Sequence, residues 1–271
     1  MSHMQKIFFI ILSLLVIFTL PNLEHGRVTG YVTASRTAQS PKQIVNVLFL
    51  GNSYTFVNDL PKMMINIATS DKVTTTMFVV KSVTKPGAHL SDLWQDGEAQ
   101  KIMHEHHWDY VVLQDQSMWV MSSQTINSGN DAAKKFAAEI KNIGAMPLIY
   151  MTWVRKPGSH WYTDQDTAFL KSPDYMHSQL HYYNYDLASH IGAMVIPVGE
   201  AWEKVMKEKP ALELYQQDGS HPSEAGTYLA ALLFYRYLGG WYTMDNATYH
   251  PANVTDSDAE YLKTLAKTQQ F

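Results

Sequence analysis

The chain has 271 residues, of which 46% are hydrophobic, with 21 lysines and arginines, 25 aspartates and glutamates, and no cysteine. This composition excludes a disordered or collagen-like chain. The net charge of −4, without basic runs, argues against nucleic-acid binding, because phosphate contacts need clustered cations. The lack of cysteine excludes disulfides, thiolate metal sites, iron–sulfur clusters and a cysteine nucleophile. The remaining chemistry is that of oxygen and imidazole groups.

The first segment of the chain is an apolar stretch, residues 7–20, that follows Lys6. Its length fits the hydrophobic region of a secretory signal and is shorter than the roughly 20 residues of a spanning helix. We therefore expect residues 1–35 to be a signal peptide and linker, with an uncleaved membrane anchor as the alternative. The protein is then exported, periplasmic or extracellular, and it touches a membrane only if this segment stays uncleaved. One domain is expected over 43–271.

Beyond residue 43, short β-branched runs alternate with segments of helical period. In chain order the predicted elements are strand 44–50, helix 58–68, strand 74–82, helix 90–104, strand 110–113, helix 130–143, strand 147–151, helix 175–191, strand 194–197, and helices 199–207, 223–238 and 257–268. The strands are largely apolar, which is typical of a parallel sheet covered by helices on both faces. The pattern predicts an α/β fold.

Candidate catalytic side chains follow the first strand and precede a late helix. Ligands of open parallel sheets bind at the carboxyl ends of the strands. Ser53 lies at such an end, after Gly51, which permits a sharp turn, and a serine nucleophile needs a base. His221 and Asp218 share a later loop, and Pro222 favours the first turn of a helix, which places His221 near that helix start. Ser53, His221 and Asp218 fit the nucleophile, base and orienting acid of a Ser-His-Asp triad.

These motifs resemble those of the SGNH (GDSL) hydrolases. Gly51-Asn52-Ser53-Tyr54 stands where that family carries Gly-Asp-Ser-Leu, and Asp218-x-x-His221 stands where it carries Asp-x-x-His. The first motif is most similar to an exported bacterial branch with Gly-Asn-Ser-[FY]-Thr. That branch continues with Gly-x-x-Leu, here Gly87 to Leu90, and Leu-Gln-[DE]-Gln-Ser, here Leu113 to Ser117. The resemblance covers residues 45–237.

The resemblance implies a three-layer α/β/α sandwich with a five-stranded parallel, flavodoxin-like sheet, and a serine esterase without cofactor or metal. Ser53 would attack the ester carbonyl while His221 takes its proton and Asp218 holds the imidazolium. The oxyanion hole would combine the backbone N–H groups of Ser53 and Gly87 with a side-chain amide. The family's asparagine for this role is missing here. We expect Gln114 to replace it, with Gln116 as the alternative.

Other residues suggest substrate contacts and a metal site. Four aromatic residues follow the third and fourth strands and are expected to rim the pocket, where such rings stack on sugars or line an acyl pocket: Trp119, Trp153, Trp161 and Tyr162. Trp119 and Trp153 are the first choices for contact with the substrate. Arg155 is a candidate contact for an anionic group. The histidine-rich segment 104–107 has metal-ligand spacing, but it precedes a strand and therefore belongs to the opposite end of the sheet. A solvated helix end is the expected structure there.

The favoured substrate is a small-molecule or glycan ester, with an acetyl ester on a carbohydrate as the first choice. Lipase-like or arylesterase activity on small acyl esters is an alternative within the same chemistry. An acyltransferase would use the same triad but exclude water from the acyl-enzyme. A non-catalytic, extracellular glycan-binding protein would keep the fold without turnover.

Overall fold

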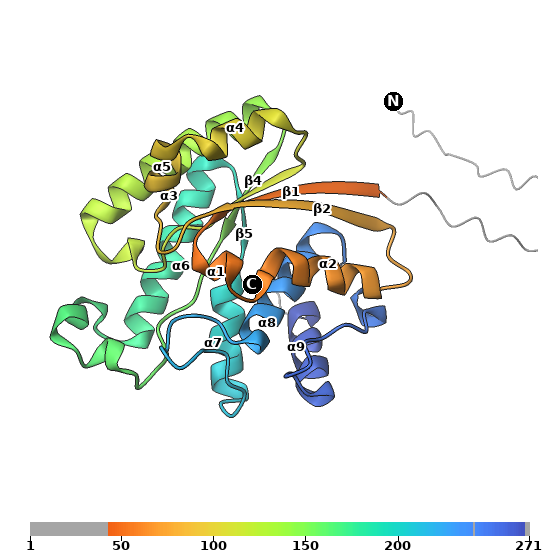
Figure 1. Ribbon diagram of the computed structural model, residues 1–271. Coiled ribbons are helices and arrows are strands. Elements are labelled where there is room, and N and C mark those ends of the chain that lie inside the picture. The colour runs from red at the N-terminus through yellow and green to blue at the C-terminus, as the bar shows by residue number, and fades with distance from the viewer. Residues whose placement is uncertain (1–42, 241, 269–271) are drawn as a thin grey trace, which may run out of the picture. The chain divides into compact units, whose positions relative to one another are not determined.

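The computed structural model describes residues 43–240 and 242–268, and five parallel strands form its central sheet (Figure 1). The strands are β1 (Gln43–Gly51), β2 (Thr76–Thr84), β3 (Tyr110–Leu113), β4 (Met146–Tyr150) and β5 (Met194–Ile196). Their order in the sheet is β2-β1-β3-β4-β5. After β1 the chain adds β2 on one side of it and then β3, β4 and β5 on the other, so the strand order reverses between β1 and β3. Ligands of such sheets bind where the strand order reverses, beyond the carboxyl ends of those two strands.

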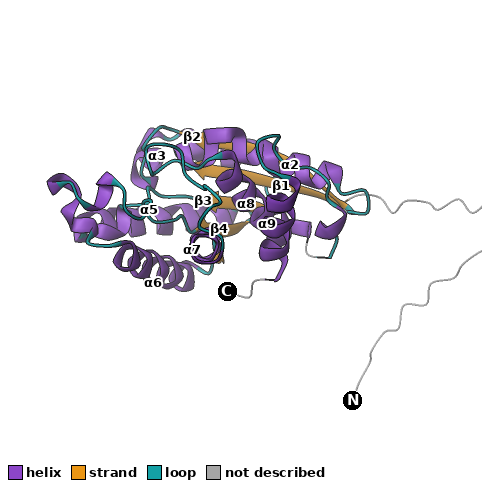
Figure 2. Cartoon of the chain, turned by 90° about the horizontal axis from the view of Figure 1, so that it is seen from below, coloured by secondary structure: helices purple, strands orange, loops and turns teal. Residues whose placement is uncertain are grey.

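Helices cover both faces of the sheet (Figures 1 and 2). One face carries α2 (Leu60–Ser70), α7 (Val198–Glu208), α8 (Glu224–Tyr235) and α9 (Asp256–Thr268). The other carries α3 (Leu90–Asp96), α4 (Glu98–Glu105), α5 (Ser123–Asn142) and α6 (Pro173–Ile191). Successive side chains of β1 join opposite cores, Phe49 the first and Leu50 the second, as the two-residue period of a strand requires. The predicted α/β fold with three layers and five parallel strands is confirmed.

Several predicted helices differ from those observed. The predicted helix 90–104 is broken at Gly97, whose φ of 80° lies in the left-handed region that favours glycine. Helix α5 begins at Ser123 instead of residue 130, because the Ser122 side chain accepts a hydrogen bond from the Thr125 N–H and caps it. The first turns of this helix are polar, so hydrophobic periodicity does not reveal them.

The predicted signal peptide and linker, residues 1–35, lie outside the described residues. Within the part of the chain that the structure describes, no helix has the length and hydropathy needed to cross a membrane. Export of the protein therefore stays a prediction.

Candidate active site

The structure brings the three predicted catalytic residues together. Ser53 is the first residue of the short helix α1 (Ser53–Phe56), and the Asn52 side chain caps this helix by accepting from the Tyr54 N–H. The Ser53 Oγ lies 2.9 Å from His221 Nε2, and His221 Nδ1 lies 2.5 Å from Asp218 Oδ2. A carboxylate can only accept, so Nδ1 carries the proton and Nε2 is left to accept from the serine hydroxyl. A base and its orienting acid therefore stand ready beside the nucleophile.

The loop that carries His221 is a tight turn rather than a helix start. Asp218 Oδ1 accepts the backbone N–H groups of Ser220 and His221, each at 2.9 Å. Pro222 pairs with Tyr215 in an isolated antiparallel bridge. The prediction that Pro222 opens the following helix is wrong, because the side chain of the next residue caps α8 instead.

The surroundings of Asp218 keep its carboxyl group ionised. Burial raises the pKa of Asp218, but the hydrogen bonds from the His221 imidazole and from the backbone N–H groups of Ser220 and His221 outweigh burial. The pKa of Asp218 therefore lies below its ordinary value. An ionised Asp218 stabilises an imidazolium form of His221, which arises when the imidazole takes a proton from the nucleophile.

Gln114 is a buried clamp and not an oxyanion donor. Its Oε1 accepts from the Asn52 N–H and the Thr55 hydroxyl, both at 2.9 Å, and its Nε2 donates to the Asp115 carbonyl at 2.7 Å. The side chain is fully buried. A Cβ at Gly51 would lie 2.4 Å from Gln114 Oε1, so Gly51 serves this close approach rather than a sharp turn. The predicted role of Gln114 in the oxyanion hole is corrected, because its Oε1 binds the loop that carries the nucleophile and its Nε2 is taken by the Asp115 carbonyl.

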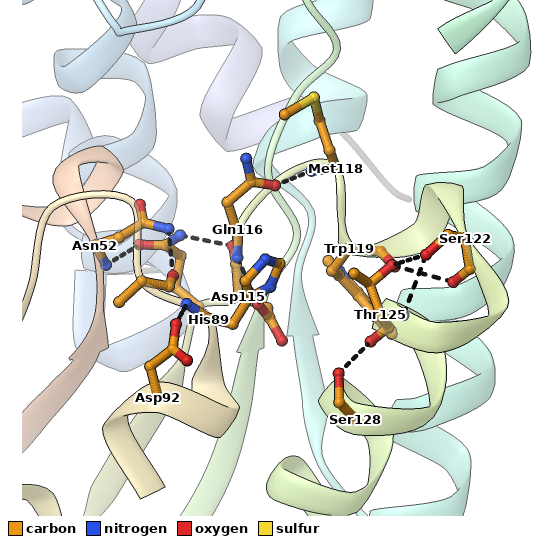
Figure 3. A network of polar contacts seen from close by, with 12 residues as sticks. Asn52, His89, Asp92, Asp115, Gln116, Met118, Trp119, Ser122, Thr125 and Ser128 are labelled. Carbon is orange, nitrogen blue, oxygen red and sulfur yellow. Dashed lines mark hydrogen bonds and ion pairs between the residues drawn. The ribbon is translucent and has the colours of Figure 1, made fainter. Parts of the chain in front are cut away.

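Gln116, the alternative donor, lies at the site with its amide nitrogen available. Its Oε1 accepts from the Met118 N–H at 2.5 Å, and its Nε2 has no hydrogen bond to any described residue (Figure 3). Gly87, with φ of 66°, lines the same cleft. Asn52 ties the two loops together, because its Nδ2 donates to the Ala88 carbonyl at 3.0 Å. The first N–H groups of a helix have no intrahelical acceptor, so the nucleophile's own N–H can also face a substrate oxygen.

The cleft around the triad has a volume of about 300 Å³. Gly87 and Gln116 line it on the oxyanion side, and Pro86, Met118 and Trp161 supply apolar surface. This volume lies at the lower end of the range for small-ligand sites. The arrangement of hydroxyl, imidazole, carboxylate and amide donors is suited to acyl transfer.

Comparison with solved structures identifies proteins of similar architecture. A protein from Slackia heliotrinireducens classed as an SGNH hydrolase is 27% identical, with 72% of this chain and 98% of that chain covered and a TM-score of 0.61. The chain belongs to the SGNH (GDSL) hydrolase superfamily. This chain is therefore a hydrolase by its relationship to that protein.

Two further structures share the fold of this SGNH hydrolase at lower identity. A DUF4886 family protein from Bacteroides uniformis is 15% identical, with coverage of 83% of this chain and 94% of that chain and a TM-score of 0.64. An acetylxylan esterase from Geobacillus stearothermophilus is 15% identical, with coverage of 74% and 96% and a TM-score of 0.55. A scan against protein-family models and a search of curated proteins find no match.

The two tryptophans predicted to touch the substrate of this SGNH hydrolase lie in its cores. Trp153 is 1% exposed, stacks between Tyr54 and Trp202, and donates from Nε1 to a backbone carbonyl of the His221 loop. Trp119 is 3% exposed. The structure corrects the prediction, because neither indole reaches the cleft. Trp161, which was also expected to rim the pocket, does line the cleft.

A contact between His89 and Asp115 joins the loop of Gly87 to the loop of Gln116. His89 Nδ1 lies 2.8 Å from Asp115 Oδ1, and the same oxygen accepts the Gln116 N–H at 2.6 Å (Figure 3). The hydrogen bond to Asp115 raises the pKa of His89 above its ordinary value, and burial, which lowers that pKa, is outweighed. The charge of Asp92, whose carboxylate accepts the His89 N–H, raises the pKa further. In its protonated form the imidazole pairs with Asp115 and holds the Gly87 loop close to Gln116.

The raised pKa of His89 predicts a pH-dependent contribution to stability. Stabilisation by the ion pair is complete below the unfolded pKa of about 6.5 and is lost as the pH rises through the raised folded pKa. The free energy of unfolding of wild type should exceed that of His89→Gln by more at about pH 5.5 than at about pH 9. Urea unfolding at the two pH values measures this. His190→Gln, on the exposed end of α6, is the matched control, and an equal difference at both pH values for His89→Gln would contradict the ion pair.

Two histidine groups bear on metal binding in this SGNH hydrolase. In the segment 104–107 the three imidazoles face three different partners, Glu139, Lys81 and Asp109, so they do not converge. His177, Glu200 and Glu203 do converge on α6 and α7, with ligand atoms within 4.8 Å of one another. None of these three residues lines the catalytic cleft. Any ion they held would therefore lie outside the acyl-transfer chemistry.

Proposed function

We propose that this SGNH hydrolase removes acetyl groups from carbohydrates by a Ser-His-Asp mechanism. The observation that carries the proposal is the chain of two contacts, 2.9 Å from Ser53 Oγ to His221 Nε2 and 2.5 Å from His221 Nδ1 to Asp218 Oδ2. A serine hydroxyl is a weak nucleophile until a base accepts its proton, and this geometry supplies the base.

The reaction passes through an acyl-enzyme. Ser53 Oγ attacks the ester carbonyl as its proton passes to His221 Nε2, and the carbonyl oxygen becomes an oxyanion facing Gly87 N–H and the Gln116 amide. When the carbon–oxygen bond of the ester breaks, the leaving alcohol takes the proton from His221. Water then attacks the acyl-enzyme, gives a proton to His221, and releases the acid while Ser53 regains its hydrogen.

The preference for acetyl groups on a sugar draws on the size of the cleft and on a structural relative. A cleft of about 300 Å³ suits a short acyl group next to one sugar unit. Trp161, on its wall, offers an aromatic face of the kind that packs against sugars. The acetylxylan esterase from Geobacillus stearothermophilus shares the fold. Predicted export fits an extracellular polysaccharide as substrate, whereas small acyl esters of other alcohols are the second candidate.

Release of acyl groups from a graded set of esters tests the proposal. Acetylated xylo-oligosaccharides and 4-nitrophenyl esters from acetyl to octanoyl are compared in wild type and Ser53→Ala. We expect wild type to release acetate from the sugar and kcat/KM to fall as the acyl chain lengthens. Higher kcat/KM for octanoyl would favour a lipase-like enzyme. Equal rates in wild type and Ser53→Ala would remove the basis for the triad, and transfer of acetyl to added sugar in place of hydrolysis would indicate an acyltransferase.

A further inference from the structure

A buried arginine lies in the wall of the catalytic cleft. Arg155 follows β4 and is 3% exposed, yet it lines the same cleft as Ser53 and His221. Arginine carries a positive charge at all working pH values, and a buried charge is stable only with a partner of opposite charge or with several hydrogen bonds. The partners of this guanidinium therefore indicate what the cleft is built to hold.

Within the part of the chain that the structure describes, Arg155 has only neutral acceptors. Its Nη1 donates to the hydroxyls of Tyr54 and Ser117, both at 2.6 Å. Its Nε is buried without an acceptor, and Nη2 has no hydrogen bond to any residue in 43–240 or 242–268. Among those residues no Asp or Glu oxygen lies within 4.0 Å of the guanidinium. Nη2 is not among the buried nitrogens without a partner, so it is the nitrogen left for an acceptor from outside the chain.

Contacts with neighbouring side chains fix the position of the Arg155 guanidinium. Its carbon lies 4.8 Å from the centre of the Trp161 ring, and Trp161 Nε1 donates to the Asp218 carbonyl at 2.7 Å. The Tyr54 hydroxyl that accepts from Arg155 also contacts the Ser220 hydroxyl at 2.7 Å. Arg155 is thus fixed against both loops of the triad, and an arginine fixed in this way loses little entropy when it binds an anion.

We propose that Arg155 binds a carboxylate of the substrate, so that the enzyme acts on acetyl esters of acidic sugars such as uronic acids. This proposal rests on the proposed function. An acetyl group carries no carboxylate, so the carboxylate that Arg155 binds must belong to the alcohol part of the ester. A carboxylate oxygen carries negative charge and accepts a charge-assisted hydrogen bond from an N–H such as that of Nη2. A sulfate ester offers the same charge with a different shape, and the experiment separates the two.

Ligand affinities of Ser53→Ala, in which the ester is not turned over, test the carboxylate site. The probes are a methyl glucuronoside carrying one acetyl group, its C6 carboxamide made from the same precursor, and an acetylated methyl glucoside 6-sulfate. NMR titration measures the three dissociation constants. We expect the carboxylate to bind roughly 10- to 100-fold more tightly than the carboxamide, the range of a charge-assisted hydrogen bond. Adding Arg155→Gln should abolish this ratio.

Lys156→Gln is the matched control, because it removes a neighbouring positive charge that pairs with Glu213. The ratio should persist in Ser53→Ala with Lys156→Gln. Equal affinities for acid and amide in Ser53→Ala would overturn the proposal even if Arg155→Gln does not fold. A ratio that survives Arg155→Gln, or tighter binding of the sulfate, would also overturn it. Preference for the acid without acetate release by wild type would support the carboxylate site and refute the proposed deacetylation.

Discussion

Ser53→Ala is expected to lower kcat for ester hydrolysis by about 10⁴- to 10⁶-fold, and His221→Ala by a similar factor. The double variant should be no slower than either single one, because the hydroxyl and the imidazole act as one unit. With the nucleophile removed, the base has no proton to take. With the base removed, the hydroxyl stays protonated and attacks poorly. Hydrolysis of 4-nitrophenyl acetate by the three variants, at saturating substrate, measures these factors.

Exposed residues of the same types provide the controls. Ser128→Ala on α5 and His190→Ala on α6 make the same chemical changes away from the cleft. Both should retain wild-type kcat. If the losses from Ser53→Ala and His221→Ala multiplied in the double variant, the two side chains would act independently, contrary to their 2.9 Å contact.

The sequence predicted the sheet and the triad because each depends on a local pattern. Apolar runs mark the buried strands, and parallel strands bring their carboxyl ends to one edge wherever the helices lie. Ser53 stands at the end of β1, and Asp218 and His221 share one short loop. Tertiary packing therefore decides only how this loop approaches Ser53. The helix ends were predicted less well, because caps such as Ser122 act through single hydrogen bonds that hydrophobic periodicity does not contain.

Residues whose roles depend on side-chain direction could not be assigned in this way. Gln114 and Gln116 have the same side chain, and both leave β3 towards the site. Which one faces the cleft depends on the Asn52 N–H and the Thr55 hydroxyl, which come from another segment and capture Gln114. Trp153 likewise follows the end of a strand, but its ring stacks between those of Tyr54 and Trp202 and is therefore buried in the core.

Gln116→Ala is expected to lower kcat by about 10²- to 10³-fold, the usual effect of removing one oxyanion-hole donor. The loss should fall on kcat rather than KM, because the amide meets the oxygen fully only when that oxygen carries negative charge. The free energy of unfolding should fall by less than in Gln114→Ala, since the side chain accepts only the half-buried Met118 N–H and no described residue accepts from its Nε2. Gln116→Glu, which keeps the side-chain shape but supplies an acceptor in place of the donor, should lose at least as much activity.

Gln114→Ala should show the opposite pattern and is the matched comparison. Its removal leaves the Asn52 N–H and the Thr55 hydroxyl buried without an acceptor, and each such group costs about 1–3 kcal/mol of stability. Activity should fall only to the extent that the loop of Ser53 shifts when its hydrogen bonds to Gln114 are lost. Urea unfolding and steady-state kinetics of both variants separate the two roles. Loss of kcat at full stability in Gln114→Ala, with Gln116→Ala fully active, would return the oxyanion role to Gln114 and would mean that its amide turns towards the cleft during the reaction.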